Sequence, residues 1–159
     1  MLGCRVVTLK RPAGFSLIEL VIVLAITGIL AGMAVPRYAN ALARYRGEAT
    51  ASRVATDLGF VRDQARQLGK TVTATFDVSA GTYSVSGVER LSHRAGDYAV
   101  DLNAEPYRAV ITSANFGGAP KVSMDRYGTS SATGQVVIRS GDITKTIFLD
   151  ATTGRVTIQ

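Results

Sequence analysis

Residues 14–35 read GFSLIELVIVLAITGILAGMAV, and the rest of the chain is organised around this stretch. From Leu20 to Val35 no residue is charged, and only Thr27 is polar. With the four residues from Phe15 included, the apolar run has the roughly 20 residues that a bilayer-spanning helix needs. Glu19 lies inside this run, where a carboxylate costs about 2.5 kcal/mol or more at mid-membrane. An acid placed there predicts a functional role with a specific partner.

The hexapeptide GFSLIE at residues 14–19, followed by the apolar run and Pro36, resembles the processing site of type IV pilins and type II secretion pseudopilins. In that family a membrane peptidase removes a short basic leader after the glycine, and the new N-terminal phenylalanine is N-methylated. The resemblance implies that Gly14 is the cleavage residue and that Phe15 is methylated. It also implies that Glu19 and Pro36 serve assembly, Glu19 through its carboxylate.

The spacing of Phe15 and Glu19 agrees with this interpretation, because residues four apart share one face of a helix. Cleavage would give Phe15 a terminal ammonium group. Glu19 of one subunit could pair with the Phe15 ammonium of a neighbour and so set the register between packed helices. The alternative is an ordinary signal anchor that carries a stray acid, although acids inside such runs are rare.

An ordinary secretory signal is a further alternative, since it would be cut after the apolar region at a small-x-small site. Ala39-Asn40-Ala41 and Ala41-Leu42-Ala43 both match such a site loosely. The glycine–phenylalanine junction in front of the run favours pilin-type processing instead. Charge counting does not orient the segment, because arginines follow it much as basic residues precede it. The location of the C-terminal part in the periplasm, outside the inner membrane, is implied by the resemblance alone.

The length of 159 residues leaves room for one anchor and one modest domain. The net charge is +6, but Arg5, Lys10 and Arg11 precede the expected cut. Without them 15 basic residues face 12 acidic ones, and a charge of about +3 is weak evidence for a nucleic-acid partner. Cys4 is the only cysteine and also precedes the cut, so we expect no internal disulfide after processing.

The sequence predicts four segments: a leader peptide at 1–14, a transmembrane or filament-core helix at 15–36, an amphipathic helix at 37–69 and a β-rich globular head at 70–159. Small and apolar residues recur every three or four positions along the second helix, which suits packing against a sheet. The predicted stripe is residues 42, 45, 49, 52, 55, 58, 61, 65 and 68.

Two charged pairs and one glycine complete the expectations for this helix. Arg44 with Glu48, and Arg53 with Asp57, are four residues apart and predict ion pairs on exposed faces. Gly69, followed by a lysine, predicts the end of the helix.

The remaining sequence alternates short β-like runs with turn signals. The expected strands are residues 71–77, 82–86, 98–102, 107–112, 121–124, 135–140, 143–150 and 155–158. Gly141-Asp142 is a tight two-residue connection of the kind that hairpins prefer. The predicted fold is therefore α+β: a long N-terminal helix, membrane-spanning in its first half, packed on a small antiparallel β-sandwich-like head.

The sequence of the expected head resembles one particular group within this family. A strand, the run Asp125-Arg126-Tyr127-Gly128, a polar loop, a valine-rich strand and a terminal Gly154-Arg155-Val156 resemble the GspH/FimT group of minor pilins and pseudopilins. This resemblance implies an inner-membrane, single-pass subunit of a type II secretion pseudopilus or type IV pilus, supporting protein secretion or pilus biogenesis. The implied partners are other pilins and pseudopilins, the prepilin peptidase, the inner membrane and an assembly platform.

Two alternatives of a different class remain: a plain membrane-tethered β-domain, and a DNA-binding minor pilin for natural transformation. Some FimT-group members carry a second arginine soon after the terminal glycine–arginine, and here that residue is absent. Arg139, Lys145 and Arg155 could still converge if the last three strands form a meander. Affinity for DNA rises with the number of basic residues on one phosphate backbone, and three contacts predict weak binding.

Catalytic chemistry finds little support in the sequence. His93 is the only histidine, and no cysteine or histidine cluster has the spacing of metal ligands. No serine lies in a nucleophile elbow, and Gly117-Gly118 lacks the lysine of a phosphate loop. We therefore expect a structural subunit rather than an enzyme, with no catalytic residue, metal or cofactor.

Overall fold

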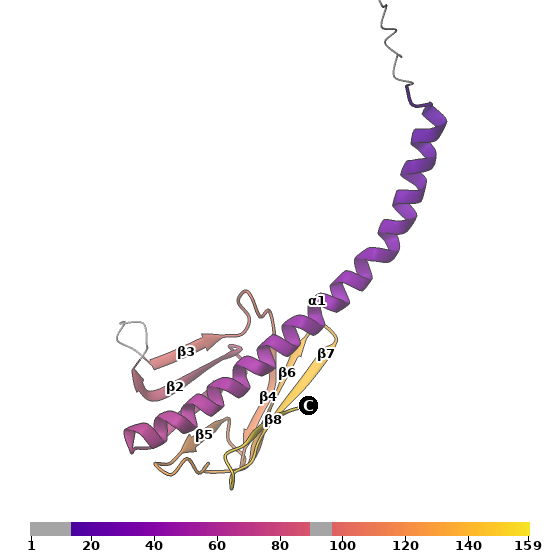
Figure 1. Cartoon of the computed structure of the whole chain (residues 1–159). Helices are drawn as coiled ribbons and strands as arrows, with labels where there is room; N and C mark the ends of the chain where they lie inside the picture. Colours follow the sequence, from indigo (N-terminus) through magenta and orange to yellow (C-terminus); the bar gives the residue numbers. More distant parts are fainter. Residues whose placement is uncertain (1–13, 90–96) are drawn as a thin grey trace, which may run out of the picture. The chain divides into compact units, whose positions relative to one another are not determined.

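The computed structural model describes residues 14–89 and 97–159, which form one helix and eight strands (Figure 1). Most of the expected leader and His93 lie outside these described residues. Helix α1 (Leu17–Leu68) is 52 residues long and contains Pro36. The chain divides into two compact units, Met1–Tyr38 and Ala39–Gln159.

The first unit presents an apolar surface on all sides of α1. Its large apolar side chains from Phe15 to Val35 are all exposed, at 50% or more of their surface. The hydroxyl of Thr27 donates a hydrogen bond to the Val23 carbonyl at 2.7 Å, so the polar group of the run is satisfied within the helix. By length and composition this part of α1 is sufficient to cross a membrane.

In the second unit one face of α1 is buried, and it is only partly the predicted stripe. Leu58, Val61 and Ala65 are buried as expected. The prediction is wrong at Leu68, which is 48% exposed, and nearer the N-terminus, where Tyr45 is 72% exposed and Ser52 is exposed. The buried positions there are instead Gly47, Thr50, Ala51, Val54 and Asp57. Two of these are polar residues whose burial depends on hydrogen bonds, which an apolar pattern does not reveal.

The helix ends where the sequence predicts. Gly69 has φ of 61°, a left-handed conformation that favours glycine at this position. The N–H of Lys70 donates to the Ala65 carbonyl at 3.3 Å, as in the Schellman motif. This bond satisfies a carbonyl that the helix end would otherwise leave without a partner.

Eight antiparallel strands form two four-stranded sheets, in the orders β3-β2-β1-β5 and β4-β6-β7-β8. The first sheet contains β1 (Val72–Asp77), β2 (Thr82–Glu89), β3 (Asp97–Asp101) and β5 (Lys121–Met124). The second contains β4 (Val110–Phe116), β6 (Gly134–Ser140), β7 (Ile143–Leu149) and β8 (Val156–Ile158). A long N-terminal helix packed on antiparallel sheets is the predicted α+β class, which is thereby confirmed.

Strand β4 differs from its prediction at 107–112. The N–H groups of Tyr107 and Arg108 both donate to the Ala104 carbonyl, so these residues belong to a turn. The N–H of Ala109 bonds to the Leu102 carbonyl at 2.8 Å, and the strand begins one residue later. The backbone hydrogen bonds of the turn thus delay β4, although Tyr107 has high β-propensity.

The core lies between the second part of α1 and the inner faces of both sheets (Figure 1). Val54, Leu58 and Val61 of α1 are buried against apolar residues that alternate along the strands. The rings of Phe76 in β1 and Phe116 in β4 stack with centroids 5.7 Å apart and so connect the two sheets.

Candidate functional site

The expected processing junction is accessible. Gly14, Phe15 and Ser16 precede α1, and the side chain of Phe15 is 84% exposed. The first helical hydrogen bond runs from the Leu20 N–H to the Ser16 carbonyl at 3.2 Å. The bond between Gly14 and Phe15 therefore lies in exposed, non-helical backbone.

Glu19 lies in the first turn of α1, near the positive end of the helix dipole, which favours a carboxylate. Phe15 stands two residues before the first helical residue, so the shared helix face expected for Phe15 and Glu19 is not formed here. Among the described residues Glu19 has no ion-pair partner. Its exposed carboxylate is available to a group outside this chain.

A second polar group lies in the head, around the buried carboxylate of Asp57. The Asp57 carboxylate accepts hydrogen bonds from the hydroxyl of Tyr83, from the hydroxyl of Tyr98 at 2.8 Å and from Nε of Arg53 at 3.1 Å. Arg53 also donates to the Tyr98 hydroxyl. We call Arg53, Asp57, Tyr83 and Tyr98 the Asp57 cluster. It joins α1 to β2 and β3.

Burial changes the chemistry of the Asp57 cluster. The predicted Arg53–Asp57 ion pair is present. The prediction that it lies on an exposed face was wrong, because the Asp57 side chain is only 10% exposed. Burial, and then the hydrogen bond to Asp57, raise the pKa of the Tyr83 hydroxyl, and the same two causes raise the pKa of Tyr98. Both tyrosines therefore remain neutral and donate to the carboxylate, and these hydrogen bonds connect α1 to β2 and β3.

The other predicted helix pair takes a different partner. Glu48 forms its ion pair with Nζ of Lys145 at 3.0 Å rather than with Arg44. Lys145 lies opposite the buried Ile138 in the β6–β7 register, which directs its side chain towards α1.

The three basic residues proposed for DNA contact do not converge, and that expectation was wrong. Strands β6, β7 and β8 do form a meander. Arg139, however, is exposed on the face opposite to Lys145, because successive residues of a strand alternate between faces. Arg155 lies at the far end of β7, where the Asp150 N–H donates to its carbonyl at 3.0 Å.

Arg155 lies instead in one of two loops that contact arginines of α1, a grouping that no local pattern in the sequence predicts. Nη1 of Arg62 donates to the Gly154 carbonyl at 3.3 Å. Nε of Arg66, one helical turn further, donates to the Tyr127 carbonyl at 2.9 Å, and Arg126 precedes that tyrosine. We call Arg62, Arg66, Arg126 and Arg155 the arginine cluster.

Close backbone packing assembles the arginine cluster. Gly154 has φ of 63°, and a Cβ there would lie 2.9 Å from the Gly128 carbonyl oxygen and 3.0 Å from Cδ of Arg62. Only glycine allows both that conformation and that approach. Gly128 and Gly154, which both belong to the head resemblance, are the sequence signal for this contact, but their partners on α1 are more than 60 residues away.

Metal-ligating groups are not gathered in the part of the chain that the structure describes. There, no three histidine, cysteine, aspartate or glutamate side chains could hold one metal ion together.

Comparison with known proteins agrees with the N-terminal features. Residues 9–35 match the family described as the prokaryotic N-terminal methylation motif. Fimbrial protein Q of Moraxella bovis is 35% identical over 87 residues, which cover 52% of this chain and 55% of that protein. The type IV major fimbrial protein FimA of Dichelobacter nodosus is 51% identical over 49 residues, covering 31% of this chain and 29% of that protein. The chain thus matches about half the length, or less, of these curated relatives.

Solved structures agree with the fold. The type IV minor pilin FimU of Pseudomonas aeruginosa aligns with a TM-score of 0.55 and 13% identity, over 73% of this chain and 90% of that chain. The minor pseudopilin EpsH from the Type 2 Secretion System of Vibrio cholerae aligns with a TM-score of 0.55 and 13% identity, over 72% and 96%. The chain is thus similar to type IV fimbrial proteins in its N-terminal part. Its head has the fold shared by a minor pilin and a minor pseudopilin.

Proposed function

We propose that the protein is a minor pilin or pseudopilin of the GspH/FimT group, which assembles into a type II secretion pseudopilus or a type IV pilus. In this role it supports protein secretion or pilus biogenesis. The observation that carries the proposal is the match to the methylation motif at residues 9–35, which includes the apolar first part of α1 with its exposed side chains. Such a surface needs lipid or neighbouring helices around it.

In this role the chain is processed, anchored in the inner membrane and then transferred into a filament. The prepilin peptidase removes residues 1–14, and the segment from Phe15 to Pro36 anchors the protein in the inner membrane as a single pass. The head lies in the periplasm until an assembly platform transfers the subunit into the filament beside other pilins. The protein acts as a structural subunit rather than as an enzyme.

Processing tests this proposal. When the full chain is expressed with a prepilin peptidase, we expect intact-mass measurement to show a protein that begins at N-methylated Phe15. Gly14→Val should retain the leader, because the substitution adds a branched side chain at the expected cleavage residue. Gly28→Ala is the matched control, since a Cβ at that position meets no atom within 4 Å, and it should be processed normally. Retention of residues 1–14, or a cut near Ala41 or Ala43, would refute pilin-type processing.

DNA binding at the arginine cluster is a second candidate function, which is favoured by the contacts of Arg62 and Arg66 with the two loops that carry Arg155 and Arg126. Among the described residues, Arg126 and Arg155 form no ion pair, whereas Arg62 pairs with Asp63 at 3.3 Å. Tyr127, whose ring lies 5.7 Å from Cζ of Arg126, is 72% exposed and could stack on a base. Four phosphate contacts are still few for tight binding at physiological salt.

We expect weak binding of duplex DNA, no tighter than about 10 µM near 150 mM salt, which is the non-specific range. Fluorescence anisotropy with a labelled duplex should give a log–log salt slope of no more than about 3.6 in magnitude, at about 0.9 per phosphate. Arg155→Ala should weaken binding, while Arg139→Ala, on another part of the head, should leave it unchanged. Sub-micromolar binding that is lost in Arg155→Ala would instead make DNA uptake the main function.

A further inference from the structure

Phe148 occupies an unusual position on the second sheet. Its neighbours along β7, Ile147 and Leu149, are buried in the core, so the Phe148 side chain lies on the opposite, outer face. The residues opposite it in the register are Gln135 of β6 and Thr157 of β8. An aromatic ring flanked by polar side chains on a solvent-facing sheet surface is a candidate for contact with a ligand.

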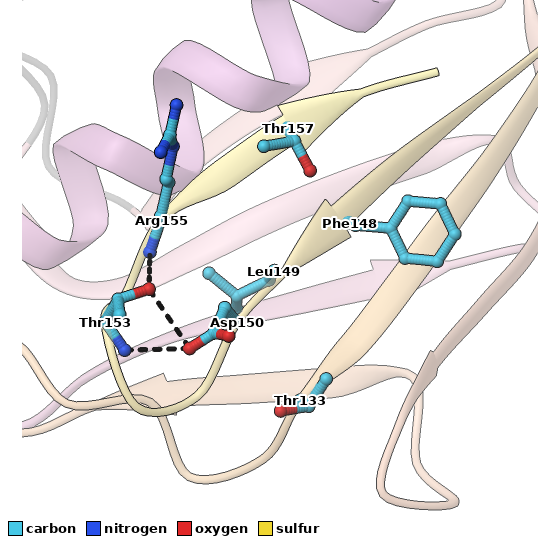
Figure 2. Close-up of a pocket in the computed structure, with 7 residues that line it drawn as sticks. All are labelled: Thr133, Phe148, Leu149, Asp150, Thr153, Arg155 and Thr157. Atoms are coloured by element: carbon cyan, nitrogen blue, oxygen red, sulfur yellow. Dashed lines mark hydrogen bonds between the residues drawn. The ribbon is translucent and has the colours of Figure 1, made fainter.

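Two hollows meet at this ring. One has a volume of about 490 Å³ and is lined by Phe148, Thr133, Asp150 and Thr157, among others (Figure 2). The other, of about 280 Å³, extends from Phe148 and Thr133 to Gln135 and Asn115. Because both hollows share Phe148 and Thr133, they form one groove that crosses all four strands of the sheet. Both hollows are shallow and open to solvent, so a ligand bound there would keep part of its surface exposed.

The polar groups of the groove are mostly neutral and include both donors and acceptors. Oγ1 of Thr133 accepts from the Ala151 N–H at 3.1 Å, which leaves its hydrogen to donate. Oδ1 of Asn115 accepts from the Gly118 N–H at 2.8 Å, which leaves the NH₂ group to donate. Gln135 and Thr157 form no side-chain hydrogen bond within the described residues. Hydrogen bonds thus hold Thr133 and Asn115 in place, whereas the side chains of Gln135 and Thr157 are free to bond to a ligand.

Two charged residues line the end of the groove, and neither offers a free charge to its centre: Asp150 accepts hydrogen bonds within its own turn, and Arg155 points away (Figure 2). Oδ1 of Asp150 accepts from the N–H and the hydroxyl of Thr153, at 2.8 and 3.0 Å. In Figure 2 the guanidinium of Arg155 points away from both Asp150 and Phe148. The centre of the groove thus lacks a cation directed inward among the residues drawn, which disfavours an anionic ligand.

We propose that this groove binds a neutral oligosaccharide, with one sugar ring packed on Phe148. A sugar ring has an apolar C–H face suited to an aromatic ring, and hydroxyl groups around its rim that donate and accept hydrogen bonds. The hydroxyl and amide groups of Thr133, Gln135 and Thr157 surround Phe148 in this way. A peptide strand would instead bond to a free sheet edge, whereas these groups lie on the face of the sheet. The site is separate from filament assembly through α1.

The chain has no tryptophan, so Phe148→Trp introduces a single reporter at the groove. The full-length variant, in a zwitterionic detergent without a sugar headgroup, is titrated with chitotetraose, cellotetraose and maltotetraose. We expect a saturable change in tryptophan emission with at least one of them, with a dissociation constant between about 10 µM and a few mM. Adding Gln135→Leu should weaken that binding about tenfold, as expected for the loss of one ligand hydrogen bond. Tyr127→Trp, in a loop that does not line the groove, should show no change.

The unaltered protein provides a second measurement that does not depend on the tryptophan. Saturation-transfer NMR should detect the same tetrasaccharide with the natural chain and lose the signal with Phe148→Ala, whose thermal unfolding confirms that the head is folded. The proposal is overturned if no tetrasaccharide gives a saturable response, if a neutral glycine–serine peptide binds the groove instead, or if Phe148→Ala binds as the natural chain does.

Discussion

Glu19→Ala is expected to remove the protein from filaments while leaving it in the membrane. Glu19 is the only charged residue of the apolar run, and its carboxylate is exposed in the first turn of α1 without a partner among the described residues. We propose that it pairs with the terminal ammonium of Phe15 on a neighbouring subunit. Removing the charge makes insertion cheaper by about 2 kcal/mol, so membrane anchoring should persist. Without this pairing, no electrostatic attraction fixes the register between neighbouring helices, so we expect the subunit to assemble poorly.

Immunoblotting of sheared filaments and of membranes measures this effect. We expect the filament-to-membrane ratio to fall at least about tenfold in Glu19→Ala, which corresponds to about 1.4 kcal/mol of lost interaction. Thr27→Val is the matched control, because the Thr27 hydroxyl is already satisfied by the Val23 carbonyl within its own helix. That variant should assemble normally. Normal incorporation of Glu19→Ala would count against the pairing with Phe15.

Asp57→Ala is expected to destabilise the head by about 3 kcal/mol, because removal of one partner from a buried ion pair leaves the others uncompensated. Three donors on Arg53, Tyr83 and Tyr98 would lose their shared acceptor. The value is at the low end for buried pairs, since the Arg53 side chain is 39% exposed. Chemical denaturation of the full chain in detergent, followed by circular dichroism, measures it.

Asp63→Ala is the matched control for Asp57→Ala. Asp63 also pairs with an arginine of α1, but its side chain is 55% exposed, so the effect should stay within about 0.5 kcal/mol. Tyr83→Phe removes one hydroxyl donor and tests the pH dependence. Because the folded state raises the pKa of Tyr83, the stabilisation is complete below the unfolded tyrosine pKa of about 10 and is lost at higher pH. Tyr83→Phe should therefore reduce the alkaline loss of stability. Equal effects of Asp57→Ala and Asp63→Ala would contradict the role of the cluster.

Local patterns in the sequence were sufficient for much of the fold. The apolar run, the glycine after Leu68 and the alternating runs of the head predicted the helix, its end and eight strands, most of them within one or two residues. These features depend on residues within four to eight positions of one another. Backbone conformation, capping and side-chain alternation act over that distance, and they can be read without knowing any partner.

Tertiary packing decided the rest. The buried face of α1 includes Thr50 and Asp57, because hydrogen bonds compensate for their burial. The two tyrosine hydroxyls that bond to Asp57 come from strands 26 or more residues away. Strand register directed Lys145 towards Glu48 and Arg139 to the opposite face, which separated residues that lie close in sequence. Gly128 and Gly154 allowed loops 26 residues apart to approach each other, and both loops contact arginines of α1, Tyr127 through Arg66 and Gly154 through Arg62. The processing motif was evident in the sequence because it is local and linear. The arginine cluster and the groove at Phe148 exist only after distant segments pack, so no local pattern could have revealed them.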